Sequence, residues 1–357
     1  MTLDISPPHS GHKTADLIVA RSRQLVDPAL REVVAQLHPW PGLMAAFSFG
    51  WCEVDGTPRE AHSGKGLRPA IAVLSAEGAG GAPETAVTGA VAVELVHAFS
   101  LIHDDIMDGD ELRRHRETVW KAYGVGPAVL AGDALLALAM DTLTGAEGAT
   151  PGLGAEMSRA LVDLVHGQAE DVAFESRPWS GPGAVTPEEY RAMASRKTGS
   201  LLGCAAALGT LLGGGSPELG AAMSLMGRHL GVAFQAVDDL LGICGDPAAT
   251  GKPVFSDLRR GKKTLPVVAA IAGGTEPGRR LAEILGSGAK DEGVPKDEDV
   301  LREAATLIEE AGGLSYAREQ ADLYLGRASH ILDTAGLDPT AAGELMILAD
   351  FLVRRTH

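Results

Sequence analysis

Apolar side chains recur at three- and four-residue spacing through most of this 357-residue chain, and that period limits the possible folds more than any other feature. Alternation of period two, which half-buried strands require, never continues beyond a few residues. Aromatic residues make up only 4% of the chain, so its core has to be built from Ala, Leu and Val, which favours closely packed helices. The sequence therefore predicts an all-α fold, with helices over residues 15–37, 84–108, 126–146, 155–174, 187–213, 217–242, 264–272, 301–312, 314–335 and 339–355.

The breaks between these segments are short and rich in Gly and Pro, and none resembles a long interdomain linker. We therefore expect a single domain over residues 1–357. The most polar break, residues 286–299, is predicted to be a surface loop. Helix starts are indicated at Pro83, Thr186 and Asp338, where capping residues, acids and early prolines occur together.

Charge and cysteine content exclude several classes of protein. A net charge of −16 argues against a nucleic acid or an anionic membrane as partner, because their binding sites are basic. Cys52, Cys204 and Cys244 have neither metal-ligand nor disulfide spacing, which is typical of the reducing cytoplasm. The N-terminal residues contain no apolar stretch, so no secretory signal is expected. The longest apolar run, Leu201 to Leu212, is too short and too rich in Gly to span a bilayer, so we expect no stable membrane insertion.

Two aspartate clusters, each followed by basic residues, indicate the chemistry. The first is Asp104-Asp105-Ile106-Met107-Asp108, leading to Arg113-Arg114. The second is Asp238-Asp239, leading to Lys252 and to Gly261-Lys262-Lys263-Thr264. On a helix, Asp104 and Asp108 lie one turn apart on the same face.

Neighbouring carboxylates in an apolar setting repel each other unless a cation lies between them. Oxygen ligands without His or Cys suit a hard ion, and Mg²⁺ takes one or two carboxylates together with substrate phosphates. The alternative interpretation of His97, Asp104 and Asp108 is a solvated acidic helix end below a core histidine. The apolar turn before the cluster and the arginines after it favour a functional site instead. The pattern predicts that a pyrophosphate group is held and released here.

Several motifs in chain order resemble those of the trans-isoprenyl diphosphate synthases, the all-α head-to-tail prenyltransferases. The resemblance spans about residues 60–357, and residues 1–59 are expected to be an N-terminal helical extension. The joint occurrence of these motifs is far more specific than any one of them. They are Gly64-Lys65-Gly66-Leu67-Arg68-Pro69, residues 104–114, residues 131–136, residues 167–171, Lys197-Thr198-Gly199, residues 231–239 and residues 251–266.

The resemblance implies an isoprenoid-synthase-type helical bundle around a central apolar cavity. It also implies that an allylic diphosphate ionises to a carbocation, which the double bond of isopentenyl diphosphate then attacks. Proton loss gives the lengthened trans-prenyl diphosphate, with the released pyrophosphate as the base, so no side chain is assigned as base. Members of the family are commonly homodimers, and we expect the same here.

The resemblance also assigns roles to individual residues of this chain. About three Mg²⁺ ions would be held by Asp104, Asp108 and Asp238, with Asp105 and Asp239 in support. The positions that match contacts to the allylic diphosphate are Arg113, Lys197, Thr198, Gln235, Lys252 and Lys262. The positions that match a metal-free pocket for isopentenyl diphosphate are Lys65, Arg68, His97 and Arg114. The residues assigned to catalysis are Asp104, Asp105, Asp108, Asp238, Asp239, Arg113, Lys197 and Lys252.

Product length in this family depends on the residues four and five positions before the first cluster, here Ser100 and Phe99. Ser100 lies one helical turn, about 5.4 Å, from Asp104 and is too small to block a tunnel. An aromatic residue at the fifth position alone is similar to geranylgeranyl-forming members, so geranylgeranyl diphosphate is the expected product. Farnesyl diphosphate is the alternative, and Phe99 could also be an ordinary core residue.

Two departures from the family pattern stand out. His115-Arg116-Glu117-Thr118 replaces the usual Gly-x-Pro-Thr turn, and Gly242 stands where the second cluster normally has a third aspartate. Gly242 leaves two alternatives open. One is a class I terpene cyclase-like enzyme, whose second metal motif is matched in degraded form by Asp238, Gly242 and Asp246. The other is a non-catalytic subunit of a hetero-oligomeric synthase. The second diphosphate pocket opposes the first alternative, and the intact first cluster opposes the second.

Overall fold

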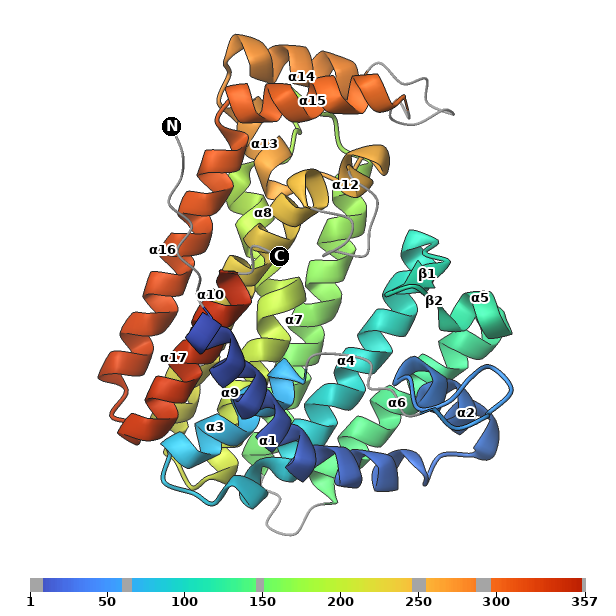
Figure 1. Cartoon of the computed structure of the whole chain (residues 1–357), viewed down its shortest axis with the longest axis vertical. Coiled ribbons are helices and arrows are strands. Elements are labelled where there is room, and N and C mark those ends of the chain that lie inside the picture. The colour runs from blue at the N-terminus through green and yellow to red at the C-terminus, as the bar shows by residue number, and fades with distance from the viewer. Residues whose placement is uncertain (1–8, 60–65, 146–150, 246–254, 287–296, 355–357) are drawn as a thin grey trace. The chain divides into compact units, whose positions relative to one another are not determined.

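The computed structural model describes residues 9–59, 66–145, 151–245, 255–286 and 297–354, and these ranges are almost entirely helical (Figure 1). The all-α prediction is therefore confirmed. The only strands in the described ranges are β1 (Leu112–Arg113) and β2 (Arg116–Glu117), which pair antiparallel as a minimal hairpin. Most of the predicted loop at 286–299 lies outside the described residues.

The chain divides into two compact units, and the expectation of one domain over residues 1–357 stays a prediction. Unit 1 comprises Met1–Arg159, Cys204–Ser224 and Leu332–Phe351. Unit 2 comprises Ala160–Gly203, Leu225–Ile331 and Leu352–His357. Both units contribute to α7 (Pro151–Glu175), α9 (Ser200–Leu212), α10 (Pro217–Cys244), α16 (Gly313–Thr334) and α17 (Pro339–Val353).

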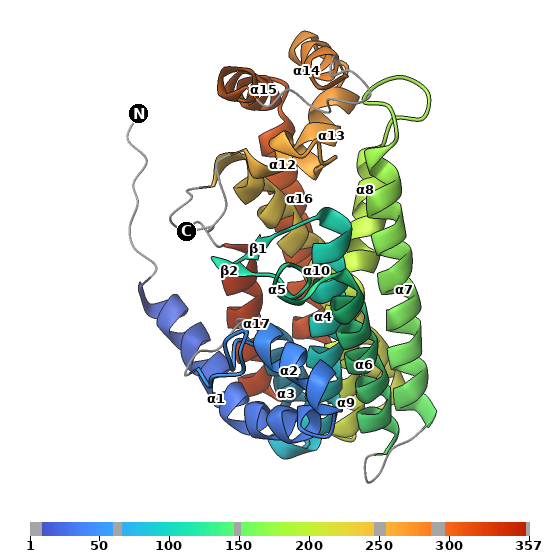
Figure 2. The same cartoon turned by 90° about the vertical axis from the view of Figure 1, so that its right-hand side faces the viewer.

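Unit 1 is organised around α4, which runs side by side with α6 in both views (Figures 1 and 2). The apolar residues of α4 are buried along most of its length because α3 and α6 both pack against it. The hairpin of β1 and β2 continues from its C-terminal end. The other elements of this unit are α1 (His9–Val34), α2 (Pro39–Ser48), α3 (Leu67–Gly78), η1 (Pro83–Ala86), α4 (Val87–Asp108), α5 (Val119–Tyr123) and α6 (Val125–Thr144).

Unit 2 contains the helices that carry the second aspartate cluster and the basic segments near it. Its α14 and α15 pack side by side (Figure 1). The predicted helix 187–213 is in fact interrupted by a π-helical segment, which the apolar period does not reveal. The remaining elements are α8 (Pro187–Ala194), η2 (Ser195–Gly199), α12 (Ser256–Arg259), α13 (Leu265–Ala272), α14 (Glu276–Gly286) and α15 (Glu298–Glu310).

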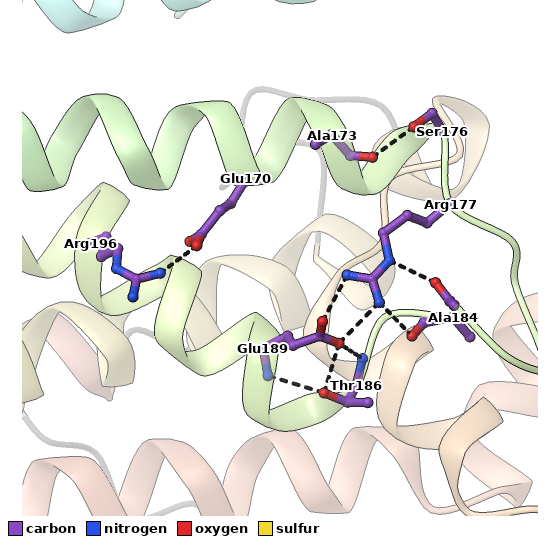
Figure 3. Close-up of polar contacts among 9 residues, drawn as sticks. Glu170, Ala173, Ser176, Arg177, Ala184, Thr186, Glu189 and Arg196 are labelled. Atoms are coloured by element: carbon purple, nitrogen blue, oxygen red, sulfur yellow. Dashed lines mark hydrogen bonds and ion pairs between the residues drawn. The ribbon is translucent and has the colours of Figure 1, made fainter.

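Two of the predicted helix starts have side-chain caps. Thr186 forms a capping box with Glu189, and Arg177 donates to the same carboxylate from 2.9 Å (Figure 3). Asp338 accepts hydrogen bonds from the backbone of Thr340 and Ala341 at 2.9 and 3.1 Å. The helix over α3 was missed because nine of its residues are buried, which removes the amphipathic pattern.

Two helices among the described residues are long and apolar enough to cross a membrane by length and composition, Pro83–Asp108 and Val125–Thr144. The buried share of the apolar window is 56% in the first helix and 33% in the second. The expectation that the chain does not insert stably into membranes stays a prediction.

Candidate active site

The first aspartate cluster lies in the last turn of α4. This helix ends at Asp108, and Gly109 caps it in the left-handed conformation with φ 66°. The unpaired carbonyl groups of a helix C-terminus carry partial negative charge. The carboxylates of Asp104, Asp105 and Asp108 therefore add to an existing negative potential, and this position favours the binding of cations.

Asp105 and Asp104 have different surroundings although they are neighbours. Asp105 is buried, and Arg113 Nε and Nη2 lie 2.8 and 2.7 Å from its Oδ1. Burial raises the pKa of Asp105, and the hydrogen bond from Arg113 opposes that shift. The same guanidinium lies 4.0 Å from Asp104, whose side chain is 20% exposed. Asp105 thus anchors Arg113, while Asp104 and Asp108 form the carboxylate pair one turn apart.

Arg114 and His115 form the two-residue turn between β1 and β2. Their φ values are +52° and +64°, which side chains rarely adopt and which cost roughly 1 kcal/mol or more each. A turn with both φ values positive usually contains Asn or Gly. Asp110 O accepts hydrogen bonds from Thr118 Oγ1 and Trp120 Nε1 at 2.7 and 2.8 Å. Arg114 and His115 therefore form a tight turn without Gly or Pro, and the hydrogen bonds to Asp110 O hold the two ends of the hairpin together.

Three residues assigned to the isopentenyl diphosphate pocket lie together in unit 1. Arg68 Nη1 is 3.0 Å from His97 Nε2, and the charge of Arg114 acts on both side chains. Burial lowers the pKa of His97 well below its usual range, so the ring is neutral and accepts this hydrogen bond. Burial also lowers the pKa of Arg68, to about 10, which leaves it charged at neutral pH.

One N–H donor of Arg68 makes no hydrogen bond to another described residue. This donor is Nε, and it is buried. A buried unsatisfied donor on a cation is costly, and an anion relieves that cost. Arg68 also lies in the first turn of α3, where backbone N–H groups favour anions. Arg68, His97 and Arg114 are therefore suited to bind a diphosphate.

Phe99 and Ser100 point to different sides of α4. The Phe99 ring packs edge-on against His103, with ring centroids 4.8 Å apart. His103 Nε2 lies 3.1 Å from Val129 O on α6, so Phe99 lies on the side of α4 that faces α6. Ser100 Oγ donates to His97 O at 2.8 Å. A bulky and a small side chain therefore occupy separate faces just before the aspartates.

In unit 2, the motif Lys197-Thr198-Gly199 lies in the π-helical segment η2. Segments of this kind are frequent at functional sites. A Cβ atom on Gly167 of α7 would lie 2.3 Å from Lys197 N, and one on Gly231 of α10 would lie 2.3 Å from Gly199 Cα. The glycines of three motifs thus allow three backbones to meet around Lys197 and Thr198.

Acidic residues of α7 pair with the basic residues of η2. Lys197 Nζ lies 2.5 Å from Asp171 Oδ2, and Arg196 pairs with Glu170 (Figure 3). Both acids belong to the motif at residues 167–171. This motif therefore positions Lys197, which the resemblance assigns to the allylic diphosphate, and its neighbour Arg196.

Asp239 is the centre of a buried hydrogen-bond network. Its Oδ2 accepts from Tyr190 Oη at 2.5 Å and from Leu265 N at 2.9 Å. Its Oδ1 accepts from Gln235 Nε2 at 3.0 Å, and Gln235 Oε1 accepts from Thr198 Oγ1 at 2.8 Å. Burial raises the pKa of Asp239 to about 7. Asp239 therefore links α8, α10 and the start of α13 through hydrogen bonds. No pattern in the sequence indicated that Tyr190 takes part in this network.

Asp238 is exposed although Asp239 beside it is buried. Lys262 is half-buried in the turn between α12 and α13, and its backbone N donates to Asp257 O at 3.0 Å. Lys65 and Lys252, as well as Asp246, lie outside the described residues. Asp104 and Asp108 belong to unit 1, and Asp238 belongs to unit 2.

The carboxylates fit the Mg²⁺ that the resemblance implies. Among the described residues, no three His, Cys, Asp or Glu side chains gather as a complete ligand set. Mg²⁺ does not need one, because it keeps water and takes phosphate oxygens in addition to one or two carboxylates. The oxygen-only pair of Asp104 and Asp108 at a helix C-terminus meets this requirement.

Comparisons with known proteins agree with this chemistry. The family model described as polyprenyl synthetase matches residues 59–302. A (2E,6E)-farnesyl diphosphate synthase of Mycobacterium tuberculosis is 42% identical over 341 residues, which cover 95% of this chain and 92% of that protein. A geranylgeranyl diphosphate synthase of the same species is 39% identical over 360 residues, which cover 99% and 98%. The crystal structure of a polyprenyl synthetase from Streptomyces coelicolor is 45% identical, with a TM-score of 0.86 and coverage of 94% and 99%. The two enzymes from Mycobacterium have different products, so identity alone leaves the product length open.

Proposed function

The chain belongs to the polyprenyl synthetase family and is a trans-prenyltransferase, and we propose from this premise that it makes geranylgeranyl diphosphate. It would do so by condensing isopentenyl diphosphate head-to-tail with an allylic diphosphate. The observation that carries the product proposal is Phe99, which is bulky, lies five residues before Asp104 and packs on the side of α4 that faces α6. Farnesyl diphosphate stays the alternative product.

The residues proposed for ionisation of the allylic substrate combine carboxylates and cations. Enzymes of this family generally depend on Mg²⁺, and Asp104, Asp108 and Asp238 would hold it. When bound, Mg²⁺ neutralises charge that develops on the departing pyrophosphate. Arg113 would bind the same group, and its bond to Asp105 fixes the guanidinium before substrate arrives. In unit 2, Lys197 would add a positive charge, oriented by Asp171.

The second substrate needs an anion site that does not depend on metal. Arg68 and Arg114 would bind the diphosphate of isopentenyl diphosphate, and neutral His97 orients Arg68 through their hydrogen bond. Lys65 is proposed for the same pocket and lies outside the described residues. Holding the double bond in a fixed place is an orientation effect that lowers the barrier to attack.

The reaction is tested by incubating purified protein with Mg²⁺, labelled isopentenyl diphosphate and one allylic primer. The primers are dimethylallyl, geranyl and farnesyl diphosphate. Mass analysis of the product should identify geranylgeranyl diphosphate. Hydrocarbon formed from an allylic diphosphate alone would identify a cyclase-like enzyme. No conversion of either kind would indicate a non-catalytic subunit.

Replacing Phe99 with Ala should lengthen the product by at least one isoprene unit. The change removes the ring that would block the growing chain, and it opens space beside His103. Product mass from the same primers is the measurement. Phe99→Tyr is the matched control because it keeps the ring and should keep the wild-type product. An unchanged product from Phe99→Ala would remove Phe99 from the chain-length role.

We also propose that the enzyme forms a homodimer. Three large apolar side chains of α6 are exposed: Val125 by 51%, Val129 by 38% and Leu130 by 55%. An apolar helix face open to water favours coverage by a second chain. A solution mass equal to one chain at micromolar concentration would contradict the dimer.

A cytoplasmic location is proposed from the cysteines. Cys52, Cys204 and Cys244 are free thiols, which suits a reducing compartment. Cell fractionation is the test, and recovery of the protein outside the cytoplasm would exclude this location.

A further inference from the structure

Unit 2 contains a cavity of about 300 Å³ between a loop and a helix. One wall is the loop at residues 178–186, which connects α7 to α8, and the other is formed by Lys263 and α13. None of the described residues assigned above to metal or substrate lines this cavity. Its volume lies at the lower end of the range of ligand pockets, so it admits a small organic molecule.

The loop wall of this cavity is held in place by Arg177. The guanidinium donates to Gly183 O at 2.7 Å and to Ala184 O at 2.8 Å. The same group pairs with Glu189 at 2.9 Å, and Glu189 also forms the capping box with Thr186 (Figure 3). These contacts tie both ends of the loop to the start of α8. The wall is therefore preformed, which lowers the entropy cost of binding a ligand against it.

Lys263 is the one ammonium group that lines the cavity, and its side chain is poorly satisfied. Only 6% of Lys263 is exposed. Its Nζ lies 3.9 Å from the centroid of the Trp179 ring and 3.4 Å from Glu175 O, which is longer than a usual hydrogen bond. Among the described residues, no carboxylate forms an ion pair with it. Burial lowers the pKa of Lys263 to about 8, and the charge of Glu175 only partly opposes this shift.

The remainder of the lining is largely apolar. Val185 and Val268 are buried, and Ile271 and the Trp179 ring are partly buried. Other lining residues are Pro178, Ala184 and Ala272. A ligand that fills this space therefore needs an apolar body, and only its charged end can meet Lys263.

The charges around the cavity select the class of ligand. An ammonium group has three N–H donors, and an anion beside it forms a charge-assisted hydrogen bond. Lys263 offers a single positive charge, because the guanidinium of Arg177 is already paired with Glu189. A diphosphate needs several cations, whereas one ammonium group suits one carboxylate.

We propose that this cavity binds a small monocarboxylate, whose carboxylate pairs with Lys263 while its apolar body packs against Trp179 and Val268. The inference goes beyond the proposed function and does not depend on the product of the enzyme. It assigns a second ligand site to unit 2, separate from the residues that would bind the two diphosphates.

Calorimetric titration of the full-length protein with octanoate tests the proposal, and octanol is the uncharged ligand of the same chain length. Saturating Mg²⁺ and inorganic pyrophosphate are present, so that the octanoate carboxylate does not bind among the cations of the active site. The wild type should bind octanoate roughly tenfold or more tightly than octanol. Lys263→Met keeps an apolar stem and removes the charge, so this preference should disappear. Ala272→Phe should weaken the binding of both ligands, because the ring would fill the cavity.

Lys121→Met is the matched control, since it removes a lysine of α5 in unit 1 and should keep the wild-type affinity. Should Lys263→Met fail to fold, Ala272→Phe still decides the question, because Ala272 is exposed at the end of α13. A wild type without saturable octanoate binding would overturn the proposal. So would wild-type octanoate affinity in either cavity variant, and so would an equal loss in Lys121→Met.

Discussion

Replacing Asp104 with Asn should lower kcat for prenyl transfer by roughly 10³-fold and leave the folded state intact. The expected loss is large because Asp104 would bind the Mg²⁺ that stabilises charge on the departing pyrophosphate. Stability should change little, because Asn has nearly the same size as Asp and the Asp104 carboxylate lies 4.0 Å from Arg113, at the limit of an ion pair. Steady-state kinetics at saturating Mg²⁺, together with thermal melting, measure both effects.

Glu111→Gln provides the control for this prediction. Glu111 is an exposed acid three residues after the cluster, and it pairs with Lys121 at 3.0 Å. The variant removes the same charge from the same unit, and its kcat should stay close to that of the wild type. Equal losses in the two variants would show that net charge matters and that a specific metal ligand does not.

Much of this site could be predicted because the sequence encodes helical faces directly. The apolar period located α4 and α10, and the spacing of Asp104 and Asp108 placed them one turn apart. The cap at Thr186 was readable from residue types alone. Motif glycines such as Gly167 and Gly231 were recognisable, and the structure supplies their physical reason in the close approach of three backbones.

Other features depend on contacts between distant segments, which no local pattern records. The sequence treats Asp238 and Asp239 as a pair, yet a rotation of about 100° per residue exposes one and buries the other. The hydrogen bond from Tyr190 to Asp239 joins residues 49 positions apart. The surroundings of Gly242 were likewise hidden, because a Cβ atom there would lie 2.0 Å from Oδ2 of Asp257, which belongs to α12.

Asp239→Ala should destabilise the protein by about 4 kcal/mol, the largest stability effect expected from any single change discussed. The substitution leaves Tyr190 Oη and Leu265 N without their acceptor. Each unsatisfied buried donor costs about 1–3 kcal/mol, and the cavity adds to that cost. Asp238→Ala is the matched control, because the neighbouring side chain is exposed and its loss should barely change the free energy of unfolding. Urea denaturation of both variants measures the difference, and equal stabilities would contradict the role of the network.

Asp239→Asn separates the charge of this residue from its hydrogen bonds. The amide oxygen of the new side chain can still accept hydrogen bonds from Tyr190 and Leu265. If the side-chain amide of Gln235 is flipped, its oxygen accepts from the new NH₂ group. The NH₂ group of Gln235 then donates to the Thr198 hydroxyl. The variant should therefore fold.

In the wild type, burial raises the folded pKa of Asp239 from 3.8 to about 7. Between pH 3.8 and about 7, Asp239 holds a proton in the folded state that it has lost in the unfolded state. The contribution of Asp239 to the unfolding free energy is therefore complete at low pH and declines as the pH rises toward about 7. Unfolding free energies measured between about pH 5 and pH 8 should fall less steeply in Asp239→Asn than in the wild type. Parallel pH profiles would mean that Asp239 does not titrate in this range.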